Sequence, residues 1–272
     1  MSGDAGLTLY HNDLSTCAQK VRIALAEKAL DWESVELDLR AGEQKTPEFL
    51  ALNPAGVVPV LVHGETTVTE STIILEYLED GFPGRPLRPE SAAARALMRG
   101  WMKRLDDRLH AMTGVLSFAL AFRHEYLALP DKGQKLIDGT PDPMARAAKM
   151  GLIQQGADFP AVGTALQEFD AALGELDAVL AESSRGFIAG SYSLAEAAWI
   201  PYVNRLEHLG LGWLWDDRQR VAKWWDDVRA RDSYSVAIAN VEKPDRVRLM
   251  HEKSAEVSDR MASWREELAQ AG

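Results

Sequence analysis

The order of strand and helix patterns in the first eighty residues is the feature that most constrains the fold. Two strand–helix pairs come first, and two β-branched runs separated by a short hairpin-like turn follow them, before an amphipathic helix. The predicted strands cover residues 7–10, 32–39, 57–62 and 66–69, and helices are predicted to begin at Ser15, Thr46 and Ser71. The pattern therefore predicts an α/β domain with the order βαβαββα.

A change of pattern near Gly84 predicts the end of this domain. Residues 83–89 are rich in proline, and no strand-like alternation follows them. Further along the chain the apolar residues recur at helical spacing, Ser193 and Glu196 fit a capping box that starts a long helix, and a polar helix is predicted at the end of the chain, over 245–271. The predicted organisation is an α/β domain at 1–84, a linker at 85–91 and an all-α domain at 92–272.

The acidic charge and the single cysteine exclude several classes of function. The formal net charge is −11 and no basic cluster interrupts the acidic surface, so no nucleic acid partner is expected. No apolar run approaches the roughly 20 residues that span a bilayer, and no secretory pattern opens the chain, so we expect no membrane partner and a cytoplasmic protein. Cys17 cannot form an intrachain disulfide, and the scattered histidines do not pair with it at metal-ligand spacing, so no metal is expected.

Ser15, Thr16 and Cys17 lie where the first strand gives way to the first helix. Unpaired amide groups and the helix dipole favour an anion at such a position. One interpretation is that the Ser15 hydroxyl donates a hydrogen bond to a bound thiolate, or that Cys17 is itself a reactive thiol of lowered pKa. The alternative is that Ser15 only caps the helix and Cys17 packs beneath it. These residues by themselves leave both interpretations open.

Two further segments of the first domain have features of a site for a peptide-like ligand. Val58 precedes Pro59 at the head of a strand, and a cis bond there would turn the Val58 backbone groups outward for a ligand to pair with. The alternative is a proline that only protects a sheet edge. Glu70 and Ser71 lie where a strand gives way to a helix, and they suit the ammonium and carboxylate of one ligand. The alternative is an ordinary cap beside a surface acid.

Together these segments resemble the glutathione transferases in their order and spacing. The residues that carry the resemblance are Ser15-x-Cys17, 21–25, 51–54, 58–61, 69–71 and 74–78. Residues 187–190 before the capping box are similar to the same superfamily, in which the box usually ends in aspartate rather than Glu196. The resemblance implies a thioredoxin-like domain that binds glutathione as a co-substrate, a helical domain behind it, and a homodimer.

The resemblance also assigns roles to individual residues. Ser15 matches the catalytic serine of zeta- and tau-like classes, and Cys17 matches the cysteine of zeta-like isomerases and of reductive dehalogenases of chlorinated hydroquinones. Tyr10 is interpreted as strand core, because Ser15 already supplies the hydroxyl. Val58 would pair with the cysteinyl part of glutathione, and Lys45 would approach the glycyl carboxylate. The glutathione-binding residues implied are Thr16, Gln44, Lys45, Val58, Pro59, Glu70 and Ser71.

A second similarity concerns the branch of the superfamily. Residues 68–83 and 87–89, with Arg99-x-Trp101, are similar to the bacterial β-aryl-etherases, which implies a role in aromatic catabolism or detoxification. The etherases differ from this chain at Ser15 to Cys17, where they have asparagine and serine.

Three functions are therefore open. The first is attack of the activated glutathione thiol on a hydrophobic or aromatic electrophile, with β-aryl ether cleavage as one example. The second is reductive dehalogenation, or an isomerisation like that of maleylacetoacetate, through Cys17. The third is a non-catalytic binding protein of the same fold. The electrophile is expected in a cleft between the domains, against an apolar stripe that also fits helix core: Met112, Val115, Phe118, Phe122 and Tyr126.

Overall fold

A mixed four-stranded sheet forms the first part of the chain in the computed structural model, which describes residues 6–140 and 142–271. The spatial order is β2-β1-β3-β4, with β1 and β2 parallel and β3 antiparallel to both β1 and β4. The strands are β1 (Leu7–His11), β2 (Trp32–Glu36), β3 (Val60–His63) and β4 (Thr66–Val68). Helices α1 (Thr16–Glu27), α2 (Pro47–Leu52) and α3 (Ser71–Gly81) complete the predicted order βαβαββα.

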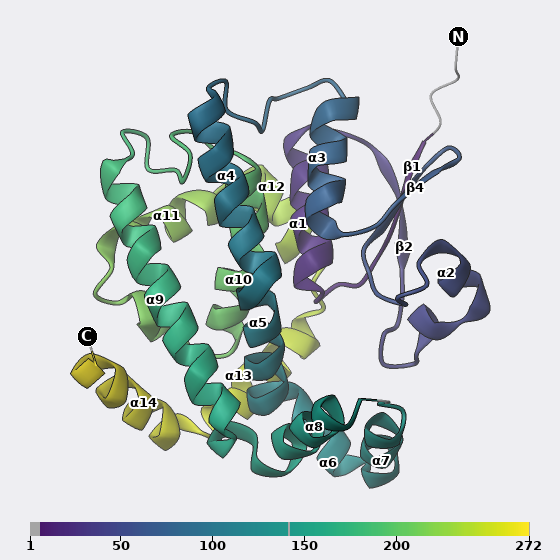
Figure 1. Cartoon of the computed structure of the whole chain (residues 1–272), viewed down its shortest axis with the longest axis vertical. Helices are drawn as coiled ribbons and strands as arrows, with labels where there is room; N and C mark the ends of the chain where they lie inside the picture. The colour runs from purple at the N-terminus through teal and green to yellow at the C-terminus, as the bar shows by residue number, and fades with distance from the viewer. Residues whose placement is uncertain (1–5, 141, 272) are drawn as a thin grey trace. The chain divides into compact units, whose positions relative to one another are not determined.

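The two faces of the sheet are covered by different helices (Figure 1): α1 and α3 lie on one face and α2 on the other. Phe49 of α2 belongs to a buried cluster with Val58 and Val60, and its ring centroid lies 6.0 Å from that of Tyr10. Leu9, the neighbour of Tyr10 in β1, is fully buried. Because successive side chains of a strand point to opposite faces, Leu9 faces the α1 and α3 layer. Tyr10 is thus part of the sheet core, as predicted.

Two predicted strand boundaries are wrong by three residues. Strand β2 ends at Glu36 rather than at residue 39, and the Asp38 amide there bonds to the Glu43 carboxylate (2.7 Å) instead of to the sheet. Strand β3 begins at Val60 rather than at Val57, because Pro59 has no amide hydrogen to give to the ladder.

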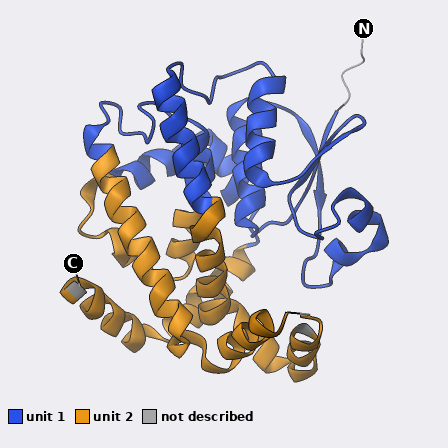
Figure 2. Ribbon diagram, viewed as in Figure 1, with its two compact units in different colours: residues 1–105, 180–201, 223–243 blue, residues 106–179, 202–222, 244–272 orange. Residues whose placement is uncertain are grey.

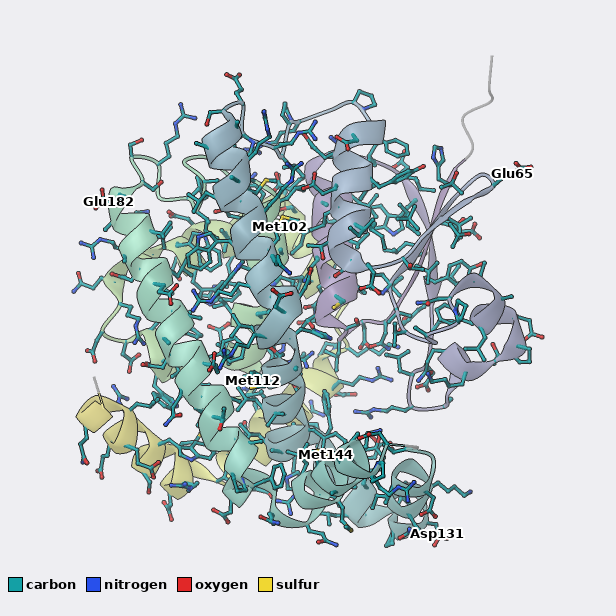
Figure 3. The ribbon with its side chains drawn as sticks, in the orientation of Figure 1. Glu65, Met102, Met112, Asp131, Met144 and Glu182 are labelled. Atoms are coloured by element: carbon teal, nitrogen blue, oxygen red, sulfur yellow. The ribbon has the colours of Figure 1, made fainter. Side chains whose placement is uncertain are left out.

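The helix after β4 also begins differently from the prediction. Its N-cap is Glu70 rather than Ser71, and no side-chain hydrogen bond caps it. The predicted hairpin between β3 and β4 is confirmed, and Glu65 lies at its tip (Figure 3).

The chain beyond the first domain is helical, as predicted. Helices α4 (Ala92–Arg104), α5 (His110–Ser117) and α6 (Arg123–Ala128) follow one another directly, joined by π-helical turns at Leu105–Leu109 and Phe118–Phe122. Each such turn holds an extra residue and shifts the later side chains around the helix axis. The regular four-residue spacing of the sequence therefore does not continue through this run as one uniform helical face.

Residues 126–160 are rich in Gly, Pro and Asp, and this segment contains helices α7 (Pro130–Asp138) and α8 (Pro143–Gln155). The long helix predicted to start at the capping box is confirmed as α10 (Leu194–His208), and α9 (Pro160–Glu182) and α11 (Gln219–Arg229) agree with the helical spacing of this part of the chain. Shorter helical turns lie at Glu43–Lys45, Gly156–Asp158, Gly212–Trp215, Asp232–Tyr234 and Ser235–Ala239.

The single terminal helix predicted over 245–271 is wrong. The structure has α13 (Pro244–Ala255) and α14 (Ser258–Ala271), with a turn between them. Buried Ser254 donates its hydroxyl to the carbonyls of Met250 (2.8 Å) and His251 (3.1 Å). A serine that bonds back to its own helix in this way bends the helix, which explains the break just after it.

The predicted capping box at Ser193 is present with Glu196 at its centre. One Glu196 oxygen accepts hydrogen bonds from the Ser193 amide (2.8 Å) and hydroxyl (2.8 Å), and the other accepts the Ile188 amide (2.6 Å). The Ser193 hydroxyl in turn accepts the Ala195 amide (3.2 Å), one residue earlier than the usual box. Burial raises the pKa of Glu196 to about 7.

The chain divides into two compact units (Figure 2). Unit 1 comprises residues 1–105, 180–201 and 223–243, and unit 2 comprises 106–179, 202–222 and 244–272. Unit 1 thus includes α4 together with the sheet, and the domain boundary predicted at 85–91 stays a prediction. Among the described residues, none of the helices has the length and apolar character needed to cross a bilayer.

Candidate active site

Ser15 is the N-cap of α1 and is half-buried. Its backbone is extended (φ −68°, ψ 112°), and its hydroxyl oxygen accepts a hydrogen bond from the Ala18 amide at 3.3 Å. A hydroxyl that accepts with its oxygen still has a proton to donate. The two interpretations of Ser15, as a cap and as a donor to a thiolate, are therefore compatible.

Thr16 and Cys17 follow Ser15 in the first turn of α1. Thr16 is buried, whereas Cys17 is half-buried and, as the one cysteine of the sequence, forms no intrachain disulfide. The structure thus places a hydroxyl and a thiol together at the positive end of one helix, where an anion is stabilised.

The loop before Ser15 is held by Asn12. The Ser15 amide donates to the Asn12 carbonyl (3.3 Å), and the Asn12 side chain accepts the Leu14 amide (3.1 Å) and donates to the Leu37 carbonyl (3.0 Å). This side chain forms a turn around its own backbone and ties that turn to the end of β2. The position of Ser15 therefore does not depend on the helix alone.

Arg22 is a buried cation beside the same loop, and the sequence interpretation did not single it out. Its guanidinium donates to His11 Nδ1 (3.1 Å) and to the carbonyls of Asn12 (3.0 Å), Asp13 (3.0 Å) and Ala237 (2.7 Å). The signal in the sequence was a charge inside the apolar run 21–25, on a helix whose other positions there are all core.

His11 is neutral in this arrangement. Burial, with the Arg22 charge as a second cause, lowers the pKa of His11 to about 4. Because arginine can only donate, Nδ1 must carry the lone pair that accepts from Arg22. Nε2 therefore carries the proton and donates to the Ser34 hydroxyl at 2.6 Å.

Val58 and Pro59 lie at the head of β3, joined by a cis peptide bond as predicted. The Val57 carbonyl accepts from the Asn53 side chain at 2.8 Å, which fixes the turn before them. Among the described residues, no hydrogen bond engages the Val58 backbone. This is the situation that a peptide-like ligand needs in order to pair as an added strand.

Glu70 and Ser71 lie at the start of α3. Glu70 is exposed and has φ 65° and ψ 113°, a region that is costly for a residue with a side chain, by about 1–3 kcal/mol. Ser71 is the first helical residue and is 5% exposed. Backbone strain of this kind concentrates at ligand sites, so the strained Glu70 next to Ser71 strengthens the sequence hypothesis.

Gln44 bonds within its own loop, whereas Lys45 reaches the turn before Val58. Gln44 donates to the Leu39 carbonyl (3.2 Å), and its side-chain oxygen is buried without a hydrogen-bond partner among the described residues. Lys45 donates to the Ala55 carbonyl (3.1 Å) and is otherwise exposed. A Cβ on Gly56, which has φ +61°, would lie 2.6 Å from the Lys45 ammonium. The structure therefore brings Lys45 against the turn that precedes Val58.

The apolar stripe of unit 2 is neither core nor open surface. All its members are half-buried: Met112 and Val115 of α5, Phe118 and Phe122 of the π-helical turn, and Tyr126 of α6. The Phe118 and Tyr126 rings are stacked, with centroids 5.3 Å apart, and the Arg205 guanidinium lies 5.6 Å from the Phe122 ring centroid. Met112 is labelled in Figure 3. Aromatic rings that stay partly accessible at a π-helical turn suit a ligand-binding role.

A second interaction in unit 2 joins the start of α6 to the end of α8. Arg123 donates to the carbonyls of Ile153 (2.9 Å) and Gln154 (3.2 Å) at the end of α8. A Cβ on Gly156, which has φ +57°, would lie 2.0 Å from the Arg123 guanidinium. A residue with a side chain at position 156 would therefore strain the backbone and displace the Arg123 guanidinium. Sequence reasoning missed this pair, since nothing in the spacing connects Arg123 with α8.

The sheet with α1 and α3 on one face and α2 on the other, and a cis-proline at the head of β3, define the thioredoxin-like class of fold. Residues 14–80 match the family described as "Glutathione S-transferase, N-terminal domain". "Glutathione S-transferase 1" of Dianthus caryophyllus is 53% identical over 91 residues, which cover 34% of this chain and 41% of that protein.

Two solved structures are similar over most of their length. LigF of Sphingobium sp. strain SYK-6, a β-etherase, has a TM-score of 0.73 at 27% identity, covering 85% of this chain and 98% of LigF. Maleylacetoacetate isomerase of Methylobacterium extorquens AM1, solved with malonate and glutathione, has a TM-score of 0.60 at 28% identity, covering 87% and 98%. The family match places residues 14–80 in the glutathione S-transferase superfamily, and the fold of most of the chain is similar to that of LigF and of the isomerase.

Proposed function

We propose that this protein is a glutathione transferase that activates the thiol of glutathione for attack on a hydrophobic, aromatic electrophile, and that a β-aryl ether is the substrate class to test first. The observation that carries the proposal is Ser15, whose hydroxyl caps α1 through its oxygen and retains a proton for a thiolate. The similarity to LigF, a β-etherase, favours the ether.

In the proposed reaction the Ser15 hydroxyl and the positive end of α1 stabilise the glutathione thiolate. The sulfur attacks the carbon that bears the aryl ether oxygen. The carbon–oxygen bond breaks as the carbon–sulfur bond forms, and the phenolate that leaves takes a proton from water. The products are a glutathione thioether and a phenol.

Glutathione itself is proposed to bind along unit 1. The Val58 backbone, beside Pro59, pairs with the cysteinyl part, while Glu70 and Ser71 hold the γ-glutamyl ammonium and carboxylate. The accessible ammonium of Lys45 approaches the glycyl carboxylate. Thr16 and the unpartnered oxygen of Gln44 complete the proposed contacts. The electrophile is proposed to bind against the half-buried stripe of unit 2 defined above.

A second candidate function uses Cys17. Cys17 lies in the first turn of α1, two residues after Ser15, and the similarity to maleylacetoacetate isomerase favours this alternative. Substitution at the electrophile needs only one glutathione, whereas reductive dehalogenation needs a second thiol and a second glutathione. After glutathione displaces chloride, the Cys17 thiolate would attack the sulfur of the aryl thioether, and the carbon–sulfur bond would break as the carbon takes a proton. A second glutathione would then cleave the resulting Cys17–glutathione disulfide to give glutathione disulfide.

The test is a panel of β-aryl ethers, chloroaromatics and maleyl compounds incubated with glutathione and either the wild-type protein or Cys17→Ser. Release of phenol by both proteins supports the ether-cleaving transferase. Chloride release or isomerisation that disappears in Cys17→Ser would replace it with the second candidate. Failure to bind glutathione in calorimetry would favour a non-catalytic binding protein.

We also propose a homodimer. Ile73 of α3 and Leu97 of α4 expose 59% and 42% of their surface, and such apolar side chains are suited to burial against a second copy. Light scattering of the wild-type protein and of Ile73→Glu tests this, with a dimer expected for the first and a monomer for the second. A cytoplasmic location remains part of the proposal.

A further inference from the structure

A buried arginine beside the Ser15 loop has no place in the function proposed above. Arg22 is 1% exposed, and its partners are three carbonyl oxygens and the ring nitrogen of neutral His11. Burying a charge is costly, and a core arginine whose hydrogen-bond partners among the described residues are all neutral is unusual. We propose that Arg22 is a positioning residue for Ser15, and that residues 235–242 act on the Ser15 loop through it. The inference rests on the proposed thiol activation.

The first step of the argument is a shared carbonyl. The Asn12 carbonyl accepts both Arg22 Nη1 (3.0 Å) and the Ser15 amide (3.3 Å). The next carbonyl, that of Asp13, accepts Arg22 Nη2 (3.0 Å) and the Gln19 side chain (3.3 Å). Both peptide groups are therefore oriented by side chains of α1, the same helix that Ser15 caps.

The second step is the far side of the guanidinium. Arg22 Nε donates to the Ala237 carbonyl (2.7 Å) in the π-helical turn Ser235–Ala239. Gln19 likewise donates to the Glu242 carboxylate at 2.7 Å. Two neighbouring side chains of α1 thus hold the Ser15 loop on one side and residues 235–242 on the other, all within unit 1. A displacement of residues 235–242 would therefore move the Ser15 loop through the hydrogen bonds of Arg22 and Gln19.

The third step is electrostatic. Burial lowers the pKa of Arg22 to about 10, so the group keeps its charge at neutral pH. The charged side chains that act on it are Asp13 of the loop, Glu36 of β2 and Glu242 of the late segment. A buried cation in a poorly screened interior favours a thiolate over a thiol nearby. Arg22 is thus suited both to hold the loop and to lower the thiol pKa of bound glutathione.

The chain offers a matched control on the same helix. Lys28 at the end of α1 is also buried, at 5% exposure, but its ammonium pairs with the Glu79 carboxylate at 3.1 Å. Lys28→Met removes a buried cation as Arg22→Met does, and it leaves the Ser15 loop untouched. Arg22→Lys keeps the charge but loses the planar fork that reaches several carbonyls at once.

The experiment has two readouts for wild type and the three variants. The first is amide hydrogen exchange of residues 12–15 in the protein without glutathione. The second is the thiol pKa of bound glutathione, read from thiolate absorbance against pH. Arg22→Met is expected to speed exchange about tenfold, and to raise the thiol pKa by about one unit because a nearby opposing charge stabilises a thiolate on about that scale. Arg22→Lys should recover much of the pKa but not the exchange, and Lys28→Met should match wild type in both.

Several outcomes overturn the inference. Unchanged exchange and thiol pKa in Arg22→Met would do so, and so would equal changes in Lys28→Met, which would indicate a general loss of stability. If wild type fails to bind glutathione, the proposed function fails, while the exchange comparison still decides whether Arg22 positions the loop. If Arg22→Met does not fold, Gln19→Leu tests the same link, with about threefold faster exchange expected, and unchanged exchange would count against the inference.

Discussion

The Ser15 loop of unit 1 and the apolar stripe of unit 2 are held in place in opposite ways. The loop is fixed by hydrogen bonds from side chains to its own backbone, above all from Asn12 and Arg22. The stripe lies on a helical run that a π-helical turn interrupts. Arg123, just after that turn, bonds to two carbonyls at the end of α8. Directional bonds define one geometry, whereas apolar packing tolerates several.

This difference agrees with what the two regions are proposed to bind. Glutathione is the same molecule in every turnover, and the thiolate must lie at a fixed distance from a donor for catalysis. A hydrophobic electrophile needs mainly a surface of suitable shape, which half-buried aromatic rings provide. We therefore expect changes in the loop to act on the chemical step, and changes in the stripe to act on substrate affinity.

The largest effect is expected for Ser15→Ala. Loss of a single donor to a developing or bound anion costs about 10²–10³ in rate, so kcat/KM for the ether should fall by that factor. Ser91→Ala is the matched control, because Ser91 caps α4 through the Ala94 amide (3.1 Å) just as Ser15 caps α1. Both variants should lose about 1 kcal/mol of stability, but the rate should fall only in Ser15→Ala. Equal rates in the two would make Ser15 a cap and nothing more.

Gly156→Ala should give the next largest effect, on stability. The added methyl group displaces the Arg123 guanidinium and strains a backbone with φ +57°, so we expect a loss of about 2–3 kcal/mol in urea unfolding. Gly114→Ala in α5, where a Cβ meets nothing within 4 Å, should be neutral or slightly stabilising. A Gly156→Ala protein as stable as wild type would show that Arg123 is not important for holding α8.

Replacing the aromatic pair of the stripe tests its proposed role directly. Phe118→Ala with Phe122→Ala should raise KM for the electrophile about tenfold and leave KM for glutathione unchanged, because apolar contacts contribute on that scale to substrate affinity. Phe187→Ala in unit 1, which removes a ring packed on Tyr192, is the control and should alter neither constant. If KM for the electrophile is unchanged in the double variant, the stripe has no role in binding the electrophile and only packs the helices.

The smallest effect concerns pH and compares a histidine from each unit. Burial lowers the pKa of His11 in unit 1 to about 4 and that of His208 in unit 2 to about 3, against 6.5 when unfolded. The unfolded chain therefore binds more protons below pH 6.5, and stability must fall as the pH is lowered from 6.5 toward 4. At pH 5.5 each histidine should cost about 1 kcal/mol.

Urea unfolding of wild type and His208→Gln at pH 7 and pH 5.5 measures this cost for unit 2. Glu196 acts in the opposite sense, since its raised pKa makes the stability it contributes fall as the pH rises from 4.5 toward 7. Its contribution cancels in the difference between the two proteins. The difference should shrink by about 1 kcal/mol at the lower pH, and a constant difference would mean that His208 does not titrate in this range.

Much of unit 1 could be predicted from the sequence because its signals are local. Ser15 and Thr46 cap their helices through amides three residues along, and the turn before Val58 is closed by Asn53. Each of these contacts joins residues at most four apart, so the residue types and their spacing are enough to indicate them. The two boundaries that failed, at residues 39 and 57, lie where the backbone leaves the sheet ladder, because the Asp38 amide bonds to Glu43 and Pro59 has no amide hydrogen.

The sequence by itself determined the order of strands and helices in the first domain, the resemblance to the superfamily and the residues proposed to meet glutathione, because short motifs carry those features. Only the tertiary structure joined Arg22 to Ala237, 215 residues along the chain, and Arg123 to the end of α8. The tertiary structure also revealed the π-helical turn at Phe118–Phe122 and the break in the terminal helix just after Ser254. For Arg22 and Arg123 the physical reason is that their partners are carbonyl oxygens of distant residues, and the spacing of residues along the chain does not indicate where folding places those oxygens.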